Sequence, residues 1–403
     1  MQYRTIGDAL VIEFWVRKEE QMNKKFEFEE TLASGLKYTE ETGRTARSLP
    51  IRECSLWQAG VDEPISDLTI LSFRQRFGAV AIPAEGIAGV ETQPAFRRQG
   101  HVRALLTRAI QGISSRVPVV FLSGIDFLYE KFGFVNCLAE SHLSLRVRDV
   151  ERETNHIPTS SAQGVRKFSA DDLPAMISLY NQVHMHRPWT HERHAGWNRL
   201  NDTQTWHPPS TGIILEREDR IAGYAIFEEP QFGHGPHSLV IDELTAKDTA
   251  AAQALLIDIA ARSWEMRFSK FLVREPLDSA VGRTAQRLGC TQNKFFPPGG
   301  GMMGAILDRQ QLLQMLEPEL KRRLGHSELN ASHQATFDAL YSGDIIPDNR
   351  ILLRLLTGHW STSDASAFGI NLPEQYAQVL DAWFPGGGTR LLPQPYSHHL
   401  DHY

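Results

Sequence analysis

A basic, glycine-marked turn between an apolar strand and a helix carries the clearest chemical signal of this 403-residue chain. Residues 86–90 predict a strand, and Arg-Arg-Gln-Gly at positions 97–100 comes directly before a predicted helix. The first backbone N–H groups of a helix lack partners within the helix and carry the positive end of its dipole, so a diphosphate can bind there. Gly100 would allow a close approach. Three arginines would add positive charge: Arg97, Arg98 and Arg103.

The helix after this turn is predicted by the spacing of its apolar residues. They recur at i, i+3, i+4, i+7, i+8 and i+11 and form one stripe: Val102, Leu105, Leu106, Ala109, Ile110 and Ile113. A stripe of this kind predicts a helix whose one face is buried.

A tyrosine in a second segment is the next residue that could do chemistry. About 30 residues after the turn, a β-rich run over 117–122 leads into Ser123-Gly124 and then Tyr129, which stands four residues before Gly133. Taken alone, Tyr129 would be a half-buried core aromatic. Its order and distance after the basic turn favour a functional role.

These two segments together resemble those of the GNAT acetyltransferases. Arg97-x-x-Gly100-x-Val102 is similar to their acetyl-coenzyme A signature, and Tyr129 matches the tyrosine whose hydroxyl protonates the departing coenzyme A thiolate in that family. Val102 departs from the small residue that is usual there. This departure and the doubled arginine are more similar to the enhanced intracellular survival (Eis) subgroup. Taken without the second segment, the basic turn could instead be an ordinary helix start whose arginines are solvated and bind no coenzyme.

The resemblance implies acetyl-coenzyme A as the co-substrate and assigns its contacts. The diphosphate would lie on the backbone of residues 98–103, the pantetheine would pair with the strand at 90–92, and the end of the facing strand would border it. The cofactor-binding residues are then Val90, Glu91, Thr92, Arg97, Arg98, Gln99, Gly100, His101, Val102, Arg103, Ser123 and Gly124.

Two groups are candidates for the base that deprotonates an amine. In Eis-type enzymes the terminal carboxylate of the chain reaches the active site of the first domain, which points to Tyr403 here. The alternative is Glu91, because some GNAT enzymes use a strand carboxylate. Glu85 has the same parity as Glu91, so both would face one side of an unbroken strand. The plainer interpretation of the histidine-rich tail is a frayed terminus.

Composition narrows the class of protein. A net charge of −6 argues against a nucleic-acid partner, and the three scattered cysteines predict neither a disulfide framework nor a zinc site. The N-terminal apolar run over 9–16 contains Glu13 and is too short for a membrane span. The histidines at 184–194 and 398–402 lack the spacing of a zinc protease, so we expect no metal. A cytoplasmic protein with no membrane partner is predicted.

The length predicts more than one domain. Residues 1–150 hold both motifs, and Ser141–Val147 is expected as the closing strand of that domain. Residues 151–301 repeat its order of strands and helices without its chemistry, because Ala246-Lys247-Asp248-Thr249 stands where 97–100 stands in the first, and Ala285 stands four residues before Gly289. Residues 302–403 would form a third domain, which only the Eis resemblance describes as sterol-carrier-protein-like.

The expected fold is therefore α+β, with tandem GNAT-like domains of mixed sheet and helices followed by a sterol-carrier-protein-like α/β domain. The expected function is transfer of an acetyl group from acetyl-coenzyme A to a primary amine, a small molecule of aminoglycoside-like or lysine type. We also expect a homo-oligomer. The alternative function is a non-catalytic protein that binds coenzyme A or a lipid ligand.

Overall fold

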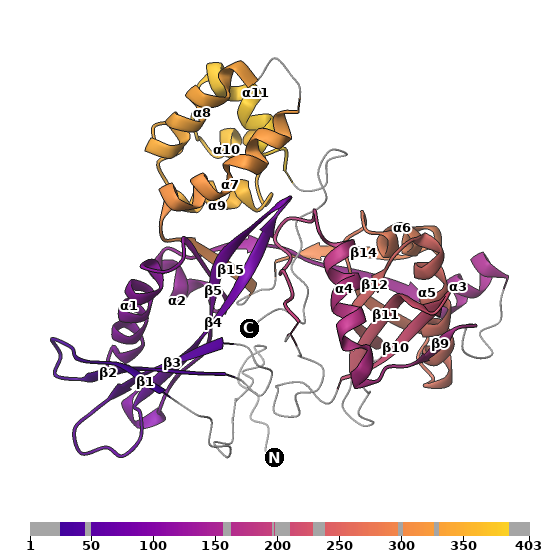
Figure 1. Ribbon diagram of the computed structural model, residues 1–403, viewed down its shortest axis with the longest axis horizontal. Coiled ribbons are helices and arrows are strands. Elements are labelled where there is room, and N and C mark those ends of the chain that lie inside the picture. The colour runs from indigo at the N-terminus through magenta and orange to yellow at the C-terminus, as the bar shows by residue number, and fades with distance from the viewer. Residues whose placement is uncertain are drawn as a thin grey trace.

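The computed structural model contains two mixed sheets and a helical region that packs on the first of them (Figure 1). It describes residues 25–44, 50–155, 163–195, 197, 210–228, 238–296, 301–325 and 330–386. In Figure 1 the first sheet lies at the left, the second at the right, and the C-terminal helices lie above the first.

Within the described residues, the first sheet has eight strands. All neighbours are antiparallel except β5 and β6, which are parallel. The strands follow one another across the sheet in the order β1 (Lys25–Thr31), β2 (Lys37–Arg44), β3 (Pro50–Trp57), β4 (Ser66–Phe77), β5 (Val80–Thr92), β6 (Val119–Gly124), β15 (Gly301–Ile306) and β7 (Val135–Leu138).

The second sheet has seven strands among the described residues, and its parallel pair is β12 with β13. Its order is β9 (Val165–Lys167), β10 (Ser210–Arg217), β11 (Arg220–Glu228), β12 (Leu239–Ala246), β13 (Lys270–Arg274), β8 (Glu140–Arg146) and β14 (Thr291–Phe295). The order of β4, β5, β6, β15 and β7 in the first sheet is thus repeated by β11, β12, β13, β8 and β14.

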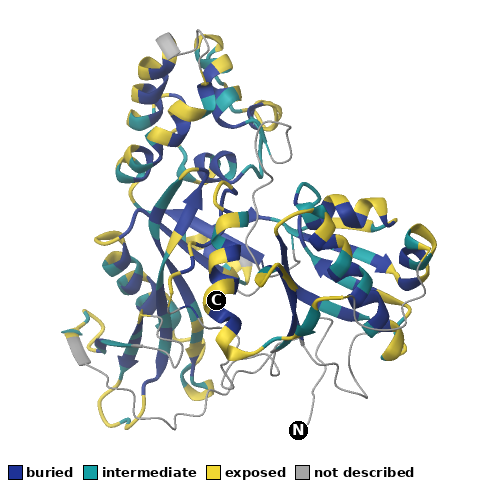
Figure 2. Cartoon of the chain, turned by 45° about the vertical axis from the view of Figure 1, so that its right-hand side comes forward, coloured by how far each residue is buried: buried dark blue, intermediate teal, exposed yellow. Residues whose placement is uncertain are grey.

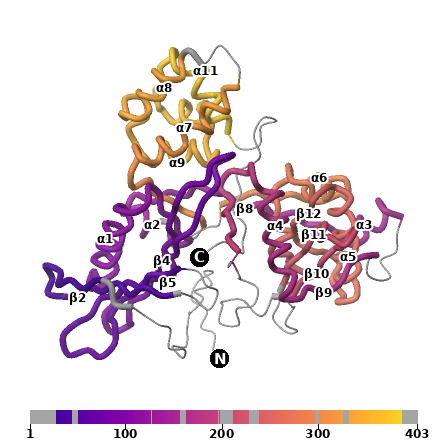
Figure 3. The backbone as a smooth tube through the Cα atoms, viewed as in Figure 1, coloured from indigo at the N-terminus to yellow at the C-terminus, as the bar shows by residue number. Residues whose placement is uncertain are grey.

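The two sheets exchange one strand each, which differs from the expected domain boundaries. Strand β8 covers most of Ser141–Val147, the expected closing strand of the first domain, but it lies between β13 and β14 of the second sheet. Strand β15, expected in the third domain, lies between β6 and β7 of the first sheet. The colours of the tube in Figure 3 show this crossing of early and late chain segments. An apolar period of two predicts a strand but not its partner.

Helices cover both faces of each sheet. The predicted helix after the basic turn is confirmed as α1 (His101–Ser114), whose Leu105, Leu106, Ala109 and Ile113 are buried. It packs on one face of the first sheet. The second sheet lies between α4 (Leu173–Val183) on one face and α5 (Thr249–Glu265) on the other. Short helices complete the two units: α2 (Asp126–Tyr129), α3 (Val147–Thr154), α6 (Ala280–Arg287), η1 (Pro94–Phe96), η2 (Glu130–Phe132) and η3 (Ala170–Asp172).

The C-terminal region is helical where the structure describes it. After β15 come α7 (Arg309–Leu324), α8 (Asn330–Ser342), α9 (Asn349–Leu356), α10 (Thr362–Ala367) and α11 (Glu374–Trp383). The described residues after 306 contain no strand, so the expected sterol-carrier-like α/β domain is not confirmed. These helices bury their apolar faces on the side of the first sheet opposite α1, and their outer faces are exposed (Figure 2). None of the helices in the described ranges is long and apolar enough to cross a membrane.

A loop of the second unit reaches across to the first sheet. Trp189, in the segment after α4, exchanges backbone hydrogen bonds with Arg76 of β4, directly and through its neighbour Thr190. Its fully buried ring packs against Phe77 and Phe121, and its indole N–H donates to the carbonyl of Leu356 on α9 at 2.9 Å. One side chain therefore contacts all three parts of the chain.

Candidate functional site

The first sheet opens between its two parallel strands. Strands β5 and β6 pair only over residues 85–87 and 120–122. Beyond this point β5 contains a bulge, because Ala88 and Glu91 pair with Thr69 and Asp67, which are only two residues apart. Gly89 takes a positive φ of 59° there, a conformation that favours glycine. The bulge turns β5 away from β6, and residues 88–91 are partly or fully exposed.

The bulge corrects the expected relation between Glu85 and Glu91. Their partners on β4, Ser72 and Asp67, are five residues apart, so the two glutamates lie on opposite faces of the sheet. Glu85 is buried against Arg52, with Nη2 and Oε2 2.5 Å apart. Glu91 is exposed at the open edge. The bulge breaks the regular alternation of β5, so the two glutamates do not face the same side as expected. Of the two, only Glu91 is accessible to a substrate.

The basic turn presents the free N-terminus of α1 beside this opening. Arg98 and Gly100 both have left-handed backbone conformations, with φ of 66° and 86°. Helix α1 has no side-chain cap at Gly100 and no acidic residue in its first turn. A Cβ built on Gly100 would meet no atom of the described residues within 4 Å, so they leave the space in front of the helix open. This arrangement suits an anion.

The side chains around the turn add charge and hold it in place. Arg97 donates from Nε to the carbonyl of Thr92 at 3.0 Å, which ties the turn to the end of β5. Arg98 and Arg103 are exposed. His101 packs edge-on against Phe96, and its buried Nε2 has no hydrogen-bond partner among the residues that the structure describes.

Tyr129 lies against the end of β6. Its ring covers Gly124, where an added Cβ would come within 2.5 Å of the Tyr129 Cε2 atom. Phe134 packs edge-on against the other side of the ring. Tyr129 is 8% exposed, and burial raises the pKa of its phenol above the ordinary value. The phenol is therefore protonated at neutral pH, and among the described residues its hydroxyl has no hydrogen-bond partner.

The predicted cofactor residues are brought together at one end of the first sheet. Val90, Glu91 and Thr92 end β5, the stretch Arg97, Arg98, Gln99, Gly100, His101, Val102 and Arg103 forms the turn and the start of α1, and Ser123 and Gly124 end β6. Tyr403 lies outside the described residues. The described histidines of 184–194 form no cluster of three His, Cys, Asp or Glu side chains that could hold a metal ion, and 398–402 are not described.

Three features of the site were missed by sequence reasoning. The bulge at Gly89 was read as part of a straight strand, although an isolated glycine in a strand is a signal for a bulge. Gly124 was expected only to border the cofactor, whereas it makes room for the Tyr129 ring. The buried pair of Arg52 and Glu85 had no local signal, because 33 residues separate its partners.

Known proteins that are similar to this chain include N-acetyltransferases. Residues 27–136 match the family model described as an acetyltransferase (GNAT) domain. The match covers most of the first unit and identifies a GNAT acetyltransferase domain over these residues. A Streptomyces avermitilis protein described as an uncharacterised N-acetyltransferase is 26% identical over 219 residues, which are 51% of this chain and 52% of the relative. The chain thus spans about half the length of that relative.

Solved structures extend the likeness of fold to most of the chain. A GCN5-related N-acetyltransferase from Anabaena variabilis aligns with a TM-score of 0.59 at 16% identity, over 87% of this chain and 89% of its own. A GCN5-related N-acetyltransferase from Kribbella flavida aligns with a TM-score of 0.57 at 15% identity, over 87% and 88%. Eis1 from Mycobacterium abscessus aligns with a TM-score of 0.56 at 15% identity, over 87% and 91%. The expected α+β fold with GNAT-like mixed sheets is confirmed over most of the chain, whereas the sterol-carrier-protein-like domain is not. At these identities the likeness concerns the fold alone.

Proposed function

We propose that this protein transfers the acetyl group of acetyl-coenzyme A to a primary amine at the open edge between β5 and β6. The observation that carries the proposal is the meeting of three features at that edge: the bulged, exposed end of β5, the uncapped start of α1 at Gly100, and the Tyr129 phenol on Gly124. The backbone N–H groups from 98 to 103 and the exposed arginines would hold a diphosphate. The exposed edge of β5 at 90–92 would bind an extended amide-containing arm.

The chain supplies the proton transfers that the reaction needs. Bound acetyl-coenzyme A would supply an activated thioester, whose C–S bond breaks as the amine nitrogen forms a bond to the carbonyl carbon. Tyr129 donates its phenolic proton to the leaving sulfur, and a carboxylate accepts the proton that the amine loses. Holding the two reactants together at one edge removes much of the entropic barrier. We propose the α-carboxylate of Tyr403 as the base, with Glu91 as the alternative.

Thiol release from acetyl-coenzyme A, measured against a panel of primary amines, tests this function. We expect amine-dependent release in the wild-type protein and a fall in kcat of about 100-fold in Tyr129→Phe, with little change in coenzyme affinity, because general acid catalysis commonly contributes at least that factor. Tyr341→Phe, on α8, is the matched control and should keep full activity. Coenzyme binding without turnover of any amine would instead favour a binding protein.

A second measurement separates the two candidate bases. Extending the chain past Tyr403 moves the α-carboxylate, and Glu91→Gln neutralises the exposed strand carboxylate. We expect the extension to lower kcat and Glu91→Gln to leave it nearly unchanged. The opposite result would assign the role to Glu91.

A further inference from the structure

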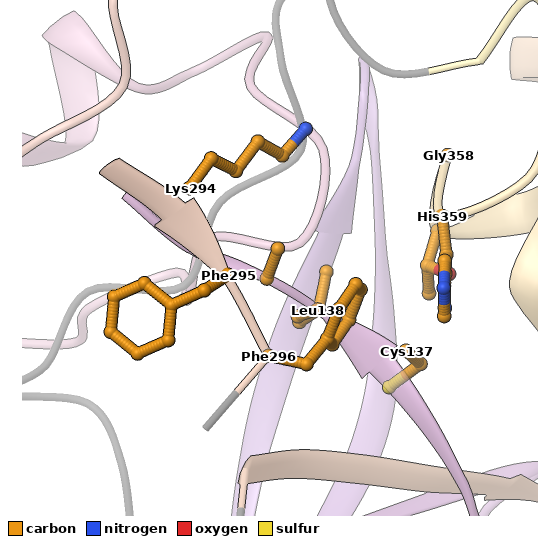
Figure 4. A pocket seen from close by; sticks show the side chains of 9 residues that line it. Cys137, Leu138, Lys294, Phe295, Phe296, Gly358 and His359 are labelled. Atoms are coloured by element: carbon orange, nitrogen blue, oxygen red, sulfur yellow. The ribbon is translucent and has the colours of Figure 1, made fainter. Parts of the chain in front are cut away.

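A cavity of about 200 Å³ lies where the three parts of the chain meet (Figure 4). Its walls come from residues 137–139 at the end of β7, 294–296 at the end of β14, and 357–359 after α9. Liquid water occupies about 30 Å³ per molecule, so the cavity has room for about seven waters or for the end of a small ligand. It is too small for a bulky polycyclic molecule.

His359 presents a hydrogen-bond acceptor in this cavity. Its Nδ1 lies 3.0 Å from the carbonyl oxygen of Asn136, and because a carbonyl can only accept, Nδ1 carries the proton. Burial lowers the pKa of the His359 imidazole, so the ring is neutral at pH 7 and Nε2 keeps its lone pair. The ring stacks on Phe296 with centroids 4.2 Å apart, which fixes its orientation.

Lys294 presents a cation on the opposite wall. Its ammonium has no ion pair within 4 Å and no hydrogen bond among the described residues, although the Asp278 carboxylate acts on it electrostatically. Figure 4 shows the Lys294 side chain rising away from the Phe296 ring. The other polar side chains are already engaged. The Thr357 hydroxyl donates to the carbonyl of Leu353 at 2.8 Å, and the buried Cys137 thiol donates to the carbonyl of Met302 at 3.5 Å.

The position of the cavity relates it to the proposed reaction. Met302 of β15 pairs with Leu138 of β7 on one side and with Ser123 of β6 on the other. Leu138 lines the cavity, and Ser123 ends the strand beside the proposed thioester position. Neighbouring strands lie about 4.8 Å apart, so the cavity wall is about 10 Å from the end of β6. A chain of several methylene groups could span that distance.

We propose that this cavity binds the far end of the amine acceptor, and that this end is a carboxylate carried on an apolar chain. The inference rests on the proposed acetyl transfer. The carboxylate pairs with Lys294, the apolar chain lies against Phe296 and Leu138, and His359 Nε2 accepts a hydrogen bond from a donor on the ligand. A positively charged aminoglycoside-like acceptor would be repelled by Lys294, so the cavity favours a lysine-type or ω-amino acid acceptor.

The first test measures binding without acetyl transfer. Calorimetry with hexanoate, hexanamide and hexylamine compares an anion, a neutral molecule and a cation of the same chain length. We expect hexanoate to bind most tightly and Lys294→Met to lower its affinity about three- to fivefold, the effect of an exposed ion pair. Lys270→Met removes an exposed lysine at the start of β13 and should change nothing. Equal binding of the three probes, or an equal loss in both variants, would overturn the proposed site.

The second test measures kcat/KM for ω-aminohexanoate and ω-aminooctanoate beside their uncharged amides. We expect the acids to be preferred about three- to fivefold, and Lys294→Met to remove that preference while leaving kcat/KM for the amides unchanged. Equal values for acids and amides in the wild type would overturn the inference and leave the acetyl transfer intact. If no amine is acetylated, the proposed function fails, and the binding test alone decides whether the cavity takes a carboxylate.

Discussion

The two units of this chain have the same strand order around a parallel pair, but only the first leaves the space beside that pair open. Each pair is three residues long, and it ends at Ile87 and Leu122 in the first unit and at Ile241 and Val273 in the second. Positions can therefore be matched by counting from these residues. After the pair, β5 becomes exposed, whereas β12 stays buried to its last residue.

Strands β5 and β12 both have a register shift just after the parallel pair, but they differ in the residue found there. Two residues after the end of the pair, the first unit has Gly89 and the second has Glu243. The Glu243 carboxylate is fully buried and accepts two hydrogen bonds from Arg193, at 2.7 and 2.6 Å. Arg193 lies between the rings of Tyr180 and Trp197, 3.6 and 3.8 Å from their centroids. The second unit thus has a buried ion pair, flanked by two aromatic rings, at the position where the first unit has Gly89, which has no side chain.

The facing strand differs in the same way. Gly124, which makes room for Tyr129, corresponds to Glu275 after β13. Glu275 is 1% exposed, and burial raises the pKa of its carboxyl to about 8. Arg274 and Asp242 bridge the two strands, with Nη1 and Oδ1 3.2 Å apart. Charged side chains therefore close the gap that the first unit keeps open.

The helix starts complete the contrast. Helix α1 begins after Gly100 without a side-chain cap, whereas Asp248 caps α5 by accepting a hydrogen bond from the backbone N–H of Ala251 at 2.8 Å. The Asp248 carboxylate supplies the negative charge that a ligand would supply at α1. The second unit has its own anion where we propose that the first binds one. The comparison suggests a division of roles, with chemistry in the first unit and support from the second.

The largest expected effect follows from breaking that support. Trp189→Ala removes the second-unit side chain that packs on Phe77 and Phe121 and donates to Leu356, so it leaves a cavity in a shared core. We expect a loss of about 3 to 5 kcal/mol in the free energy of unfolding, measured by denaturant titration. Trp264→Ala on α5 is the matched control. Trp264 is 58% exposed, so its loss should change stability by no more than about 0.5 kcal/mol. Equal effects would show that the loop does not support the first unit.

A carboxylate at the start of α1 would imitate the Asp248 cap of α5 and should block the proposed coenzyme site. Gly100→Asp places a carboxylate before α1, and two like charges about 4 Å apart repel by about 4 kcal/mol at an effective dielectric of 20. We expect calorimetry to show acetyl-coenzyme A affinity reduced at least about 100-fold. Gly100→Asn brings the same shape and the same backbone strain without charge, so it should retain more affinity than Gly100→Asp. Equal losses would assign the effect to strain, and unchanged affinity in Gly100→Asp would move the coenzyme elsewhere.

Local features of the first unit could be predicted from the sequence because their causes are local. The stripe from Val102 to Ile113 has the period of a helix, and the turn before it has a glycine at the position that needs a positive φ. The missing chemistry of the second unit is equally local, since its matching stretch, residues 246–249, has no glycine and contains the acidic Asp248. In the structure Asp248 is the N-cap of α5.

The arrangement of these parts could not be predicted, because it depends on contacts between distant residues. Strands β8 and β15 have apolar patterns that fit either sheet, so their exchange has no signature in sequence. Trp189 lies in a histidine-rich segment, and nothing near it in the sequence indicates that it reaches β4. Glu243 and Glu275 each follow another charged residue, Asp242 and Arg274, and their burial depends on partners from other strands and loops.

The pH dependence of Tm tests whether Glu275 is buried as a neutral carboxylic acid beside the parallel strands of the second unit. Because the pKa of the Glu275 carboxyl is about 8 in the folded chain and about 4.3 when unfolded, only the unfolded state loses this proton between those values. The stability that the group contributes is fully present below about pH 4.3 and is lost as the pH rises through 8. We expect Glu275→Gln, which stays neutral, to raise Tm relative to wild type increasingly from pH 5 to pH 8.5. A difference in Tm that does not change with pH would mean that Glu275 is charged in its buried position.

The smallest effect is expected from removing the side-chain cap at the N-terminus of α5 in the second unit. Asp248→Ala removes the cap of α5, and the loss of an N-cap costs about 1 kcal/mol. The variant frees a helix N-terminus, yet we expect calorimetry to show the same number of coenzyme sites as in the wild type. The strands behind that terminus remain closed by Glu243 with Arg193 and by Asp242 with Arg274, so the freed N–H groups have no channel beside them. A second coenzyme site in Asp248→Ala would show that the cap alone separates the two units and that the buried charges do not.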